Sequence, residues 1–356
     1  MLKIIQTLDE LDNFKPAWDA LYEADDLATP FQHFEYIRLS LESGTGTSGK
    51  PYIIAVKDDA SNTWTAVFPF LLDKNGILRF INDTHSDFCS PVIRPAFRHF
   101  NLFKEFSEHI FRENGIKGLC LKNLQDSSPL LSVLKPHFRY LVCQDFNYYS
   151  TIPIIAKDSD KDEIDAFRYV LAKQRSNLRK TKKRSRTDCS FGILSAKDGH
   201  TYPAEEIRSL ADRMVDEGKR AREYFSDSFI AFWEKLYEKG LLSVAVLKRG
   251  DEVLSCNFMY HDAKHKEYIK WLMLYTENQW NMVINILIAE EIYHSDEVDT
   301  INFARGIYDY KLTNFHPDVK ALFCLRIAKT RRGHIRNILA TAVHYAKPVV
   351  KSFLRR

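Results

Sequence analysis

A short segment in the last third of the chain gathers the side chains best suited to catalysis. It reads Phe-Ala-Arg-Gly-Ile-Tyr-Asp-Tyr-Lys over residues 303–311 and continues an apolar run that predicts a strand from Thr300. Gly306 lets the chain turn sharply after that strand, because glycine tolerates backbone conformations that other residues avoid. The turn then brings together Arg305, Tyr308, Asp309, Tyr310 and Lys311.

These side chains supply three kinds of chemistry. Arg305 or Lys311 can hold a substrate anion or an oxyanion. Tyr310 can donate a proton, and Asp309 can orient its neighbours or accept one. For Asp309 an alternative of equal weight is an ion pair with a lysine that only fixes the loop.

A second carboxylate, Asp87, lies in the segment His-Ser-Asp-Phe-Cys between aromatic and thiol neighbours. A role as general base or as the group that binds a substrate amine is one interpretation. The other is an Asx turn, in which the carboxylate only bonds to the backbone of its own loop.

A strongly basic segment follows the middle of the chain. Residues 168–187 contain nine Lys and Arg and no acid. Helical spacing places Arg175, Arg179, Lys182 and Arg186 in one stripe. This stripe is interpreted as a site for an anionic partner: a cofactor pyrophosphate, tRNA, a lipid headgroup or an acidic patch of the protein itself. A solvated face is the alternative.

The elements that must position these residues form a repeated pattern. Apolar runs separated by turn residues predict a three-stranded meander at 52–57, 63–72 and 77–82, and another at 242–248, 253–260 and 268–275. Helices precede and follow each meander, and the matching Lys57 and Lys248 are 191 residues apart. We expect an α+β fold made of two duplicated halves, residues 1–155 and 156–330, followed by a tail helix at 331–356.

Four segments resemble one known family. They are "ATPFQHFEYI" (28–37), "NDTHSDFCSPVI" (82–93), "LAKQRSNLRKTKKR" (171–184) followed by the strand "CSFGIL", and "TINFARGIYDYK" (300–311). In this order they are similar to the CelD-like acyltransferases, a double-GNAT group related to the FemABX enzymes. The resemblance spans roughly residues 28 to 330.

The resemblance implies two tandem GNAT-like halves, each a mainly antiparallel mixed sheet flanked by helices. It implies an N-acyltransferase that moves an acetyl-type group from acyl-CoA to an amine, such as an amino sugar or a lipid-linked amine, in cell-envelope or surface-polysaccharide biosynthesis. It also favours catalytic roles for Asp87, Tyr310 and Lys311. Catalysis is expected to be direct transfer without a metal.

One stretch departs from that pattern. Coenzyme A pyrophosphate is usually cradled by a glycine-rich turn at a helix N-terminus, but residues 276–283 contain no glycine. Two alternatives therefore stay open. One is a FemABX-like aminoacyl transferase that docks charged tRNA on the basic helix. The other is a catalytically idle scaffold or nucleic-acid binder with the same fold.

The cysteines, the N-terminal residues and the C-terminal segment indicate where the protein acts. The six cysteines form no CxxC pair, which indicates reduced core thiols. The N-terminal residues lack the pattern of a secretory signal and no run is long enough to span a bilayer, so a cytoplasmic protein is expected.

Residues 331–356 carry seven Lys and Arg and no acid beside an apolar stripe, and we predict an amphipathic helix on the inner membrane surface. Docking on the protein's own body or on a second subunit is the alternative.

Overall fold

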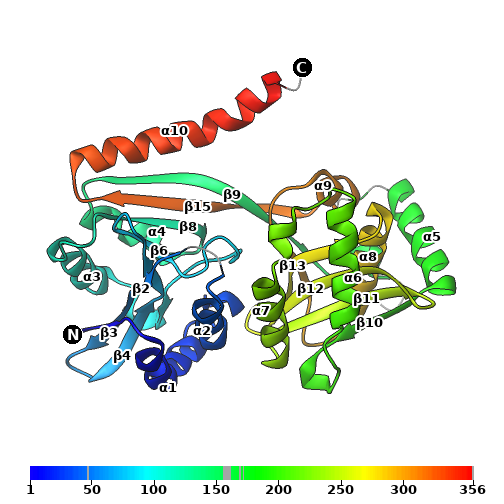
Figure 1. The fold of residues 1–356 in the computed structure, drawn as a ribbon, viewed down its shortest axis with the longest axis horizontal. Helices are drawn as coiled ribbons and strands as arrows, with labels where there is room; N and C mark the ends of the chain where they lie inside the picture. Colours follow the sequence, from blue (N-terminus) through cyan, green and yellow to red (C-terminus); the bar gives the residue numbers. More distant parts are fainter. Residues whose placement is uncertain (46–47, 155–161, 168–169, 171, 355–356) are drawn as a thin grey trace. The chain divides into compact units, whose positions relative to one another are not determined.

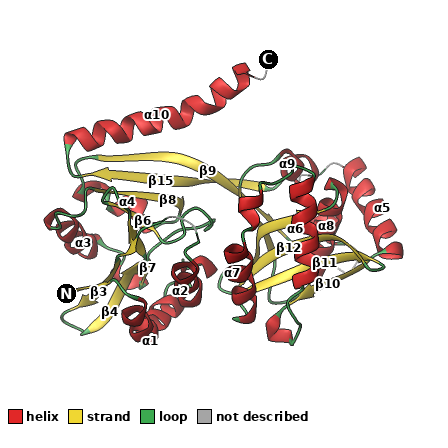
Figure 2. Ribbon diagram, viewed as in Figure 1, coloured by secondary structure: helices red, strands yellow, loops and turns green. Residues whose placement is uncertain are grey.

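The computed structural model describes residues 1–45, 48–154, 162–167, 170 and 172–354. The chain forms two compact units: residues 1–147 with 321–356, and residues 148–320. Both units combine β-sheets with helices packed on them (Figures 1 and 2). The α+β fold class expected from the sequence is confirmed.

The first unit begins with a strand that the apolar pattern did not reveal. β1 (Leu2–Ile5) pairs with β3 (Ile53–Asp58), and the order of this sheet is β1-β3-β4-β7, with β4 (Thr63–Phe68) and β7 (Val92–Ile93). Between β1 and β3 lie α1 (Leu8–Ala24), which begins with a capping box formed by Thr7 and Glu10, and α2 (Phe34–Ser43). A capping box satisfies backbone N–H groups that the first helical turn leaves unpaired.

The other strands of this unit run in the order β15, β8, β6, β5, β2. Their bounds are β2 (Lys50–Pro51), β5 (Phe70–Leu72), β6 (Ile77–Phe80) and β8 (Gly118–Gln125), and two helices, α3 (Phe100–Arg112) and α4 (Pro129–Val133), belong to the same unit. Aromatic rings fill the core: Phe68 stacks on Phe106 of α3 at 4.5 Å between ring centroids. Such offset aromatic contacts stabilise a core beyond the area they bury.

The second unit repeats this arrangement. Its strands run β10-β11-β12-β13-β14-β9, and their bounds are β10 (Ser190–Leu194), β11 (Leu242–Arg249), β12 (Glu252–Asp262), β13 (Glu267–Tyr275), β14 (Thr300–Arg305) and β9 (Leu141–Pro153). Its helices are α5 (Ala172–Asp188), α6 (Ala204–Asp216), α7 (Asp227–Glu238), α8 (Asn278–Tyr293) and α9 (Asp309–Phe315). β9 and β15 (Asp318–Ala328) each contribute residues to both units.

Helix α8 is the central helix of the second unit. Its residues from Val283 to Ala289 are all buried, and they pack on strands β11 and β12 in one apolar cluster with Met259 and Phe303. A helix that is apolar on every side must be enclosed by the fold. Polar side chains on such a helix therefore require a partner inside the protein.

The chain ends in α10 (Arg331–Leu354), the C-terminal helix expected from the sequence (Figure 1). α9 was not predicted, because its seven residues are too few to show a helical period.

Candidate active site

Two parallel strands of the second unit separate where the site begins. β13 and β14 pair only through Glu267–Ile269 and Thr300–Asn302, whereas β13 stays paired with β12 as far as Tyr275. Lys270 and Phe303 are the first residues beyond the shared pairing. The separation leaves room between the strands for side chains and, toward the carboxyl ends, for a ligand.

Lys311 holds the end of β14 in this geometry. Its side chain is 2% exposed, and its Nζ donates hydrogen bonds to the carbonyl oxygens of Phe303 (2.7 Å) and Gly306 (2.8 Å). Gly306 has φ +100°, and a Cβ there would lie 2.9 Å from the ring of Tyr308. The lysine thus fixes a turn that needs glycine, so it positions the loop.

A buried polar cluster lies beside that turn. Lys270 is fully enclosed and donates to Oδ1 of Asn285 on α8, and its Nζ lies 3.6 Å from the sulfur of Met273. Burial and the neighbouring Lys311 charge hold the pKa of Lys270 well below its usual range. Lone polar groups inside an apolar core are costly unless paired, so this cluster is the best candidate for chemistry in the second unit.

Tyr310 links the cluster to the surface. Its hydroxyl donates to the sulfur of Met273 at 3.2 Å. Burial raises the pKa of Tyr310, against a smaller lowering from a hydrogen bond with Asn281. Tyr310 is therefore protonated at neutral pH and able to act as a proton donor.

A cavity of about 470 Å³ opens beside Tyr310. It lies at the end of β13, the first turn of α8 and the start of α9, and it is lined by Tyr275, Asn278, Gln279, Asn281, Met282, Asp309, Tyr310 and Asn314. A second cavity of about 490 Å³ against α5 shares Met282 and Asn314 with it. Both volumes are in the usual range for small-molecule sites.

The structure brings together part of the predicted set. Asp309 and Tyr310 line the cavity, while Lys311 points into the interior. Asp309 is exposed on the first turn of α9. Arg305 and Gly306 are half-buried at the end of β14, and Gly306 N–H donates to the Tyr148 carbonyl at 2.7 Å.

Asp87 belongs to the first unit, where it is 5% exposed. Its loop is held by a buried network: the Gln32 side chain donates to the Phe88 carbonyl (2.9 Å), and the Asn123 side chain donates to the Ser86 carbonyl (3.0 Å). Two motifs that are far apart in sequence, Thr-Pro-Phe-Gln and Ser-Asp-Phe, thus pack together. The network fixes the loop around Asp87 and does not by itself assign chemistry to it.

The basic stripe of α5 has partners within the second unit. Arg179 pairs with Asp162 (2.7 Å) and Asp165 (2.6 Å), and Lys182 pairs with Glu163 (2.9 Å). Arg175 lies 3.9 Å from Asp165, Lys182 also lies 3.2 Å from Glu290, and Arg186 reaches Glu290 at 2.5 Å. Hydrogen bonds with the two carboxylates raise the pKa of Arg179. Of the alternatives weighed for the stripe, these ion pairs match the acidic patch of the protein itself.

Sequence reasoning missed Lys270, Asn281 and Asn285. The signals were present: Lys270 interrupts an apolar strand, and the two asparagines stand four residues apart within the largely apolar stretch from Trp280 to Ala289. Three of the four acids that pair with α5, Asp162, Glu163 and Asp165, lie just before the segment whose charges were counted.

Part of the chain matches a known domain family, and its fold matches several solved structures. Residues 172–312 match the family of acetyltransferase (GNAT) domains. No curated protein matches the chain. Among solved structures, L-PGS from Bacillus licheniformis is 13% identical with a TM-score of 0.58, covering 92% of this chain and 96% of that one. FemX is 12% identical with a TM-score of 0.56 (91% and 96% covered), and a tandem GNAT protein from the clavulanic acid pathway is 10% identical with a TM-score of 0.50 (93% and 99%).

Residues 172–312 therefore belong to the GNAT acetyltransferase domain family. The chain as a whole has the fold of the double-GNAT proteins, which confirms the tandem GNAT-like fold and the FemABX-like resemblance expected from the sequence. In the described parts of the chain, no helix combines the length and apolarity needed to cross a bilayer. No cluster of three or more His, Cys, Asp or Glu that could hold a metal ion was found among the described residues.

Proposed function

We propose that this protein transfers an acyl group from acyl-CoA to an amine acceptor, an amino sugar or a lipid-linked amine, in building the cell envelope or surface polysaccharides. The observation that carries the proposal is the cavity at the separated ends of β13 and β14, with Tyr310 and Asn281 on its wall. No cysteine is among the described residues that line this cavity. Direct transfer suits such a site.

The reaction needs one proton donor and one place for developing charge. The amine nitrogen attacks the thioester carbonyl, the carbon–sulfur bond breaks, and the proton lost by the amine balances the proton taken by the leaving sulfur. Tyr310 can give its proton to the sulfur and recover one from the amine. The amide of Asn281 can donate to the oxyanion.

The N-terminus of α8 bears on the identity of the donor. The N-terminal turn of α8 has Glu277 at its N-cap, with no side-chain cap hydrogen bond. The negative charge of Glu277 repels a pyrophosphate, although the helix dipole attracts anions to this end of the helix. This observation supports aminoacyl-tRNA as a second candidate donor, and the exposed Lys180, Lys183 and Arg184 of α5, which have no carboxylate partner among the described residues, offer it a basic face.

Filling the cavity is expected to block the donor. Asn314→Trp places an indole where the two cavities meet, so coenzyme A affinity measured by calorimetry should fall at least about tenfold. Thr313→Trp, on the exposed side of the same helix, is the matched control and should leave affinity unchanged. Equal affinity of both variants and the wild type would place the donor elsewhere, and binding of aminoacyl-tRNA but not coenzyme A would favour the second candidate.

We also propose that α10 binds to an anionic membrane surface. Among residues 334–347 of α10, the half-buried ones follow one helical stripe and are polar: His334, Asn337, Thr341 and His344. His334 and His344 pack on Tyr140 and Phe146, with ring centroids 5.3 Å and 5.2 Å apart. The polar face of the helix therefore contacts its own unit.

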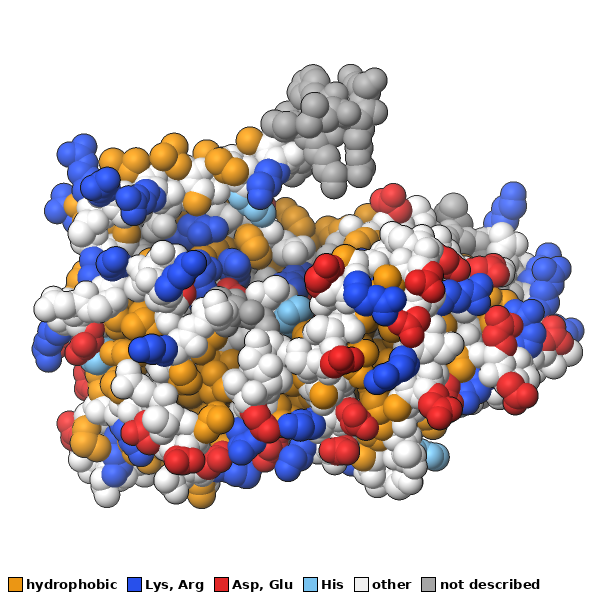
Figure 3. Space-filling view, in the orientation of Figure 1, with side chains coloured by type: hydrophobic (Ala, Val, Ile, Leu, Met, Phe, Trp, Pro, Cys, Tyr) orange, Lys and Arg blue, Asp and Glu red, His pale blue; other side chains and the backbone are white. Residues whose placement is uncertain are grey.

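The apolar face of α10 is exposed instead. Ile335, Ile338, Leu339 and Val343 are 49%, 48%, 60% and 55% exposed, and Figure 3 shows hydrophobic side chains along the outer side of this helix with Lys and Arg at its N-terminal end. Apolar side chains between cations suit a helix lying in the plane of an anionic membrane. A second copy would bring equal positive charges together, which disfavours self-association through this face.

We expect Ile338→Ser/Leu339→Ser to lose vesicle binding. Two large side chains leave the interface, so flotation with phosphatidylglycerol vesicles should fall on the order of tenfold or more. The melting temperature should not change, because both side chains are already exposed. Val319→Ser, at another exposed apolar residue, is the control; undiminished flotation of the double variant would refute membrane docking through α10.

A further inference from the structure

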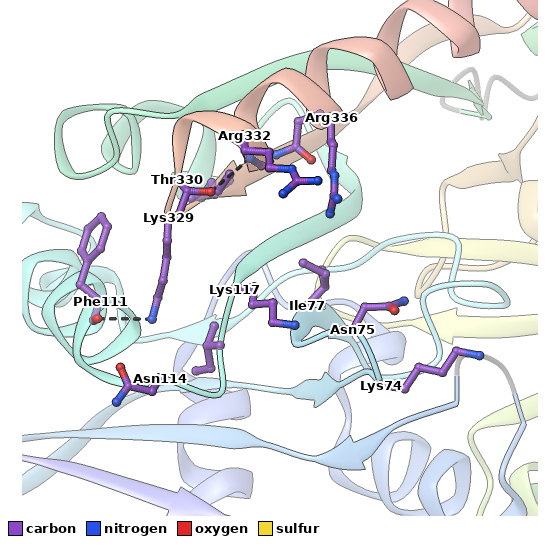
Figure 4. A pocket seen from close by; sticks show the side chains of 15 residues that line it. Lys74, Asn75, Ile77, Phe111, Asn114, Lys117, Lys329, Thr330, Arg332 and Arg336 are labelled. Atoms are coloured by element: carbon purple, nitrogen blue, oxygen red, sulfur yellow. Dashed lines mark hydrogen bonds between the residues drawn. The ribbon is translucent and has the colours of Figure 1, made fainter.

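A cavity of about 660 Å³ in the first unit is surrounded by cations. Its lining includes Lys74, Lys117, Lys329, Arg332 and Arg336 and no acidic residue. Figure 4 shows Arg332 and Arg336 reaching down from α10 toward the strand ends that carry Lys117. All residues that line this cavity belong to the first unit, whereas those that line the proposed active-site cavity belong to the second.

Backbone pairing places Lys117 beside Lys329 and beside the turn that carries Lys74. Lys117 N–H donates to the Gly76 carbonyl (2.7 Å), and Lys329 N–H donates to the Lys117 carbonyl (3.3 Å). A Cβ at Gly76 would lie 2.7 Å from the Gly115 carbonyl oxygen, so these segments approach as closely as backbones can. Lys117 and Lys329 continue the register of β8 and β15, in which Ala328 lies opposite Gly118. Like charges placed opposite each other destabilise a sheet.

The fold does not neutralise this charge with nearby carboxylates. Asp73, beside Lys74, is already bonded to Arg79 at 3.1 Å. Lys329 Nζ donates to the carbonyl oxygens of Phe111 and Glu113. Burial lowers the pKa of Lys329, and only the Glu113 charge opposes that effect. In the described part of the chain, Lys74, Lys117, Arg332 and Arg336 form no ion pair.

The first turn of α10 adds to the positive potential. Thr330 Oγ1 accepts from Gly333 N–H at 3.1 Å, which caps one backbone donor and leaves others of the first turn at the rim of the cavity. The positive end of a helix dipole favours anions, as do side-chain cations. Three strand ends and one helix start thus converge on a single positive cavity.

We propose that this cavity binds a phosphate-bearing ligand with at least two negative charges. Such a ligand brings enough charge to offset several cations, and the volume accommodates a small molecule or a lipid headgroup. The site is separate from the donor cavity, so it adds a second anion site to the protein.

Inorganic pyrophosphate is the probe. Calorimetry on the whole protein should detect binding that weakens with salt. Lys117→Met and Arg336→Met should each lower affinity at least about fivefold, since each removes one charge contact of roughly 1 kcal/mol or more. Lys104→Met, at an exposed lysine of α3 outside the cavity lining, is the matched control and should bind as the wild type does.

The two single variants keep the test valid if one fails to fold. Removing Lys117 relieves repulsion with Lys329, so that variant is expected to melt no lower than the wild type. If vesicles containing phosphatidic acid compete with pyrophosphate, the natural ligand is a lipid headgroup. If they do not compete, it is a soluble phosphate, and both results support the site. No pyrophosphate binding, or equal affinity in the wild type and both variants, overturns the proposal.

Discussion

Tyr310→Phe is expected to lower the rate of acyl transfer by about 100- to 10,000-fold, the usual contribution of a general acid. The substitution removes only the hydroxyl that contacts Met273 and keeps the ring in place. Donor affinity should change little, so the loss should appear in kcat. Because burial raises the pKa of Tyr310 above its ordinary value, its deprotonation should not limit the rate of the wild-type enzyme at neutral pH.

Tyr308→Phe is the matched control. Tyr308 stacks on Tyr310 with ring centroids 6.2 Å apart, but it is 51% exposed and does not line the cavity. Single-turnover assays with acetyl-CoA and an amine panel should separate the two variants. If Tyr310→Phe transfers the acyl group at the wild-type rate, the proton donor is another group.

The meanders could be predicted because alternation and turn residues are local signals. β11, β12 and β13 follow the predicted runs closely. The run at 63–72 divides into β4 and β5 at Pro69, which has no N–H to donate to a ladder. β1 and α9 were missed because neither is long enough to display a period.

The site was harder to predict, because its members act through tertiary contacts. The sequence placed Tyr310 and Lys311 side by side, but α9 turns one toward the cavity and the other into the interior. The partners of Lys270 come from β13 and α8, and no spacing rule connects them. The α5 stripe illustrates the same limit, since its acids lie on a separate turn and on α8.

Lys311→Met is expected to destabilise the protein by about 2 to 5 kcal/mol. The substitution leaves the carbonyl oxygens of Phe303 and Gly306 without the donor they have now, and a buried polar group without a partner costs about 1 to 3 kcal/mol. Removing a buried charge is itself stabilising and offsets part of this loss. The net effect is still destabilising, because the two hydrogen bonds are short and the geometry of the turn depends on them. Transfer should also fall, because Tyr310 stands next to this turn.

Lys270→Met provides the opposite case within the same cluster. Lys270 is fully buried with one amide acceptor and a sulfur contact, and its lowered pKa reflects poorly compensated burial. Its replacement is expected to change the free energy of unfolding by less than about 1 kcal/mol, since an apolar side chain of similar length often replaces a buried charge without loss. Urea denaturation of both variants, with Lys180→Met on exposed α5 as reference, measures the difference. If Lys311→Met is as stable as Lys270→Met, then Lys311 does not hold the turn, and its role would have to be sought in a contact with the substrate instead of the backbone.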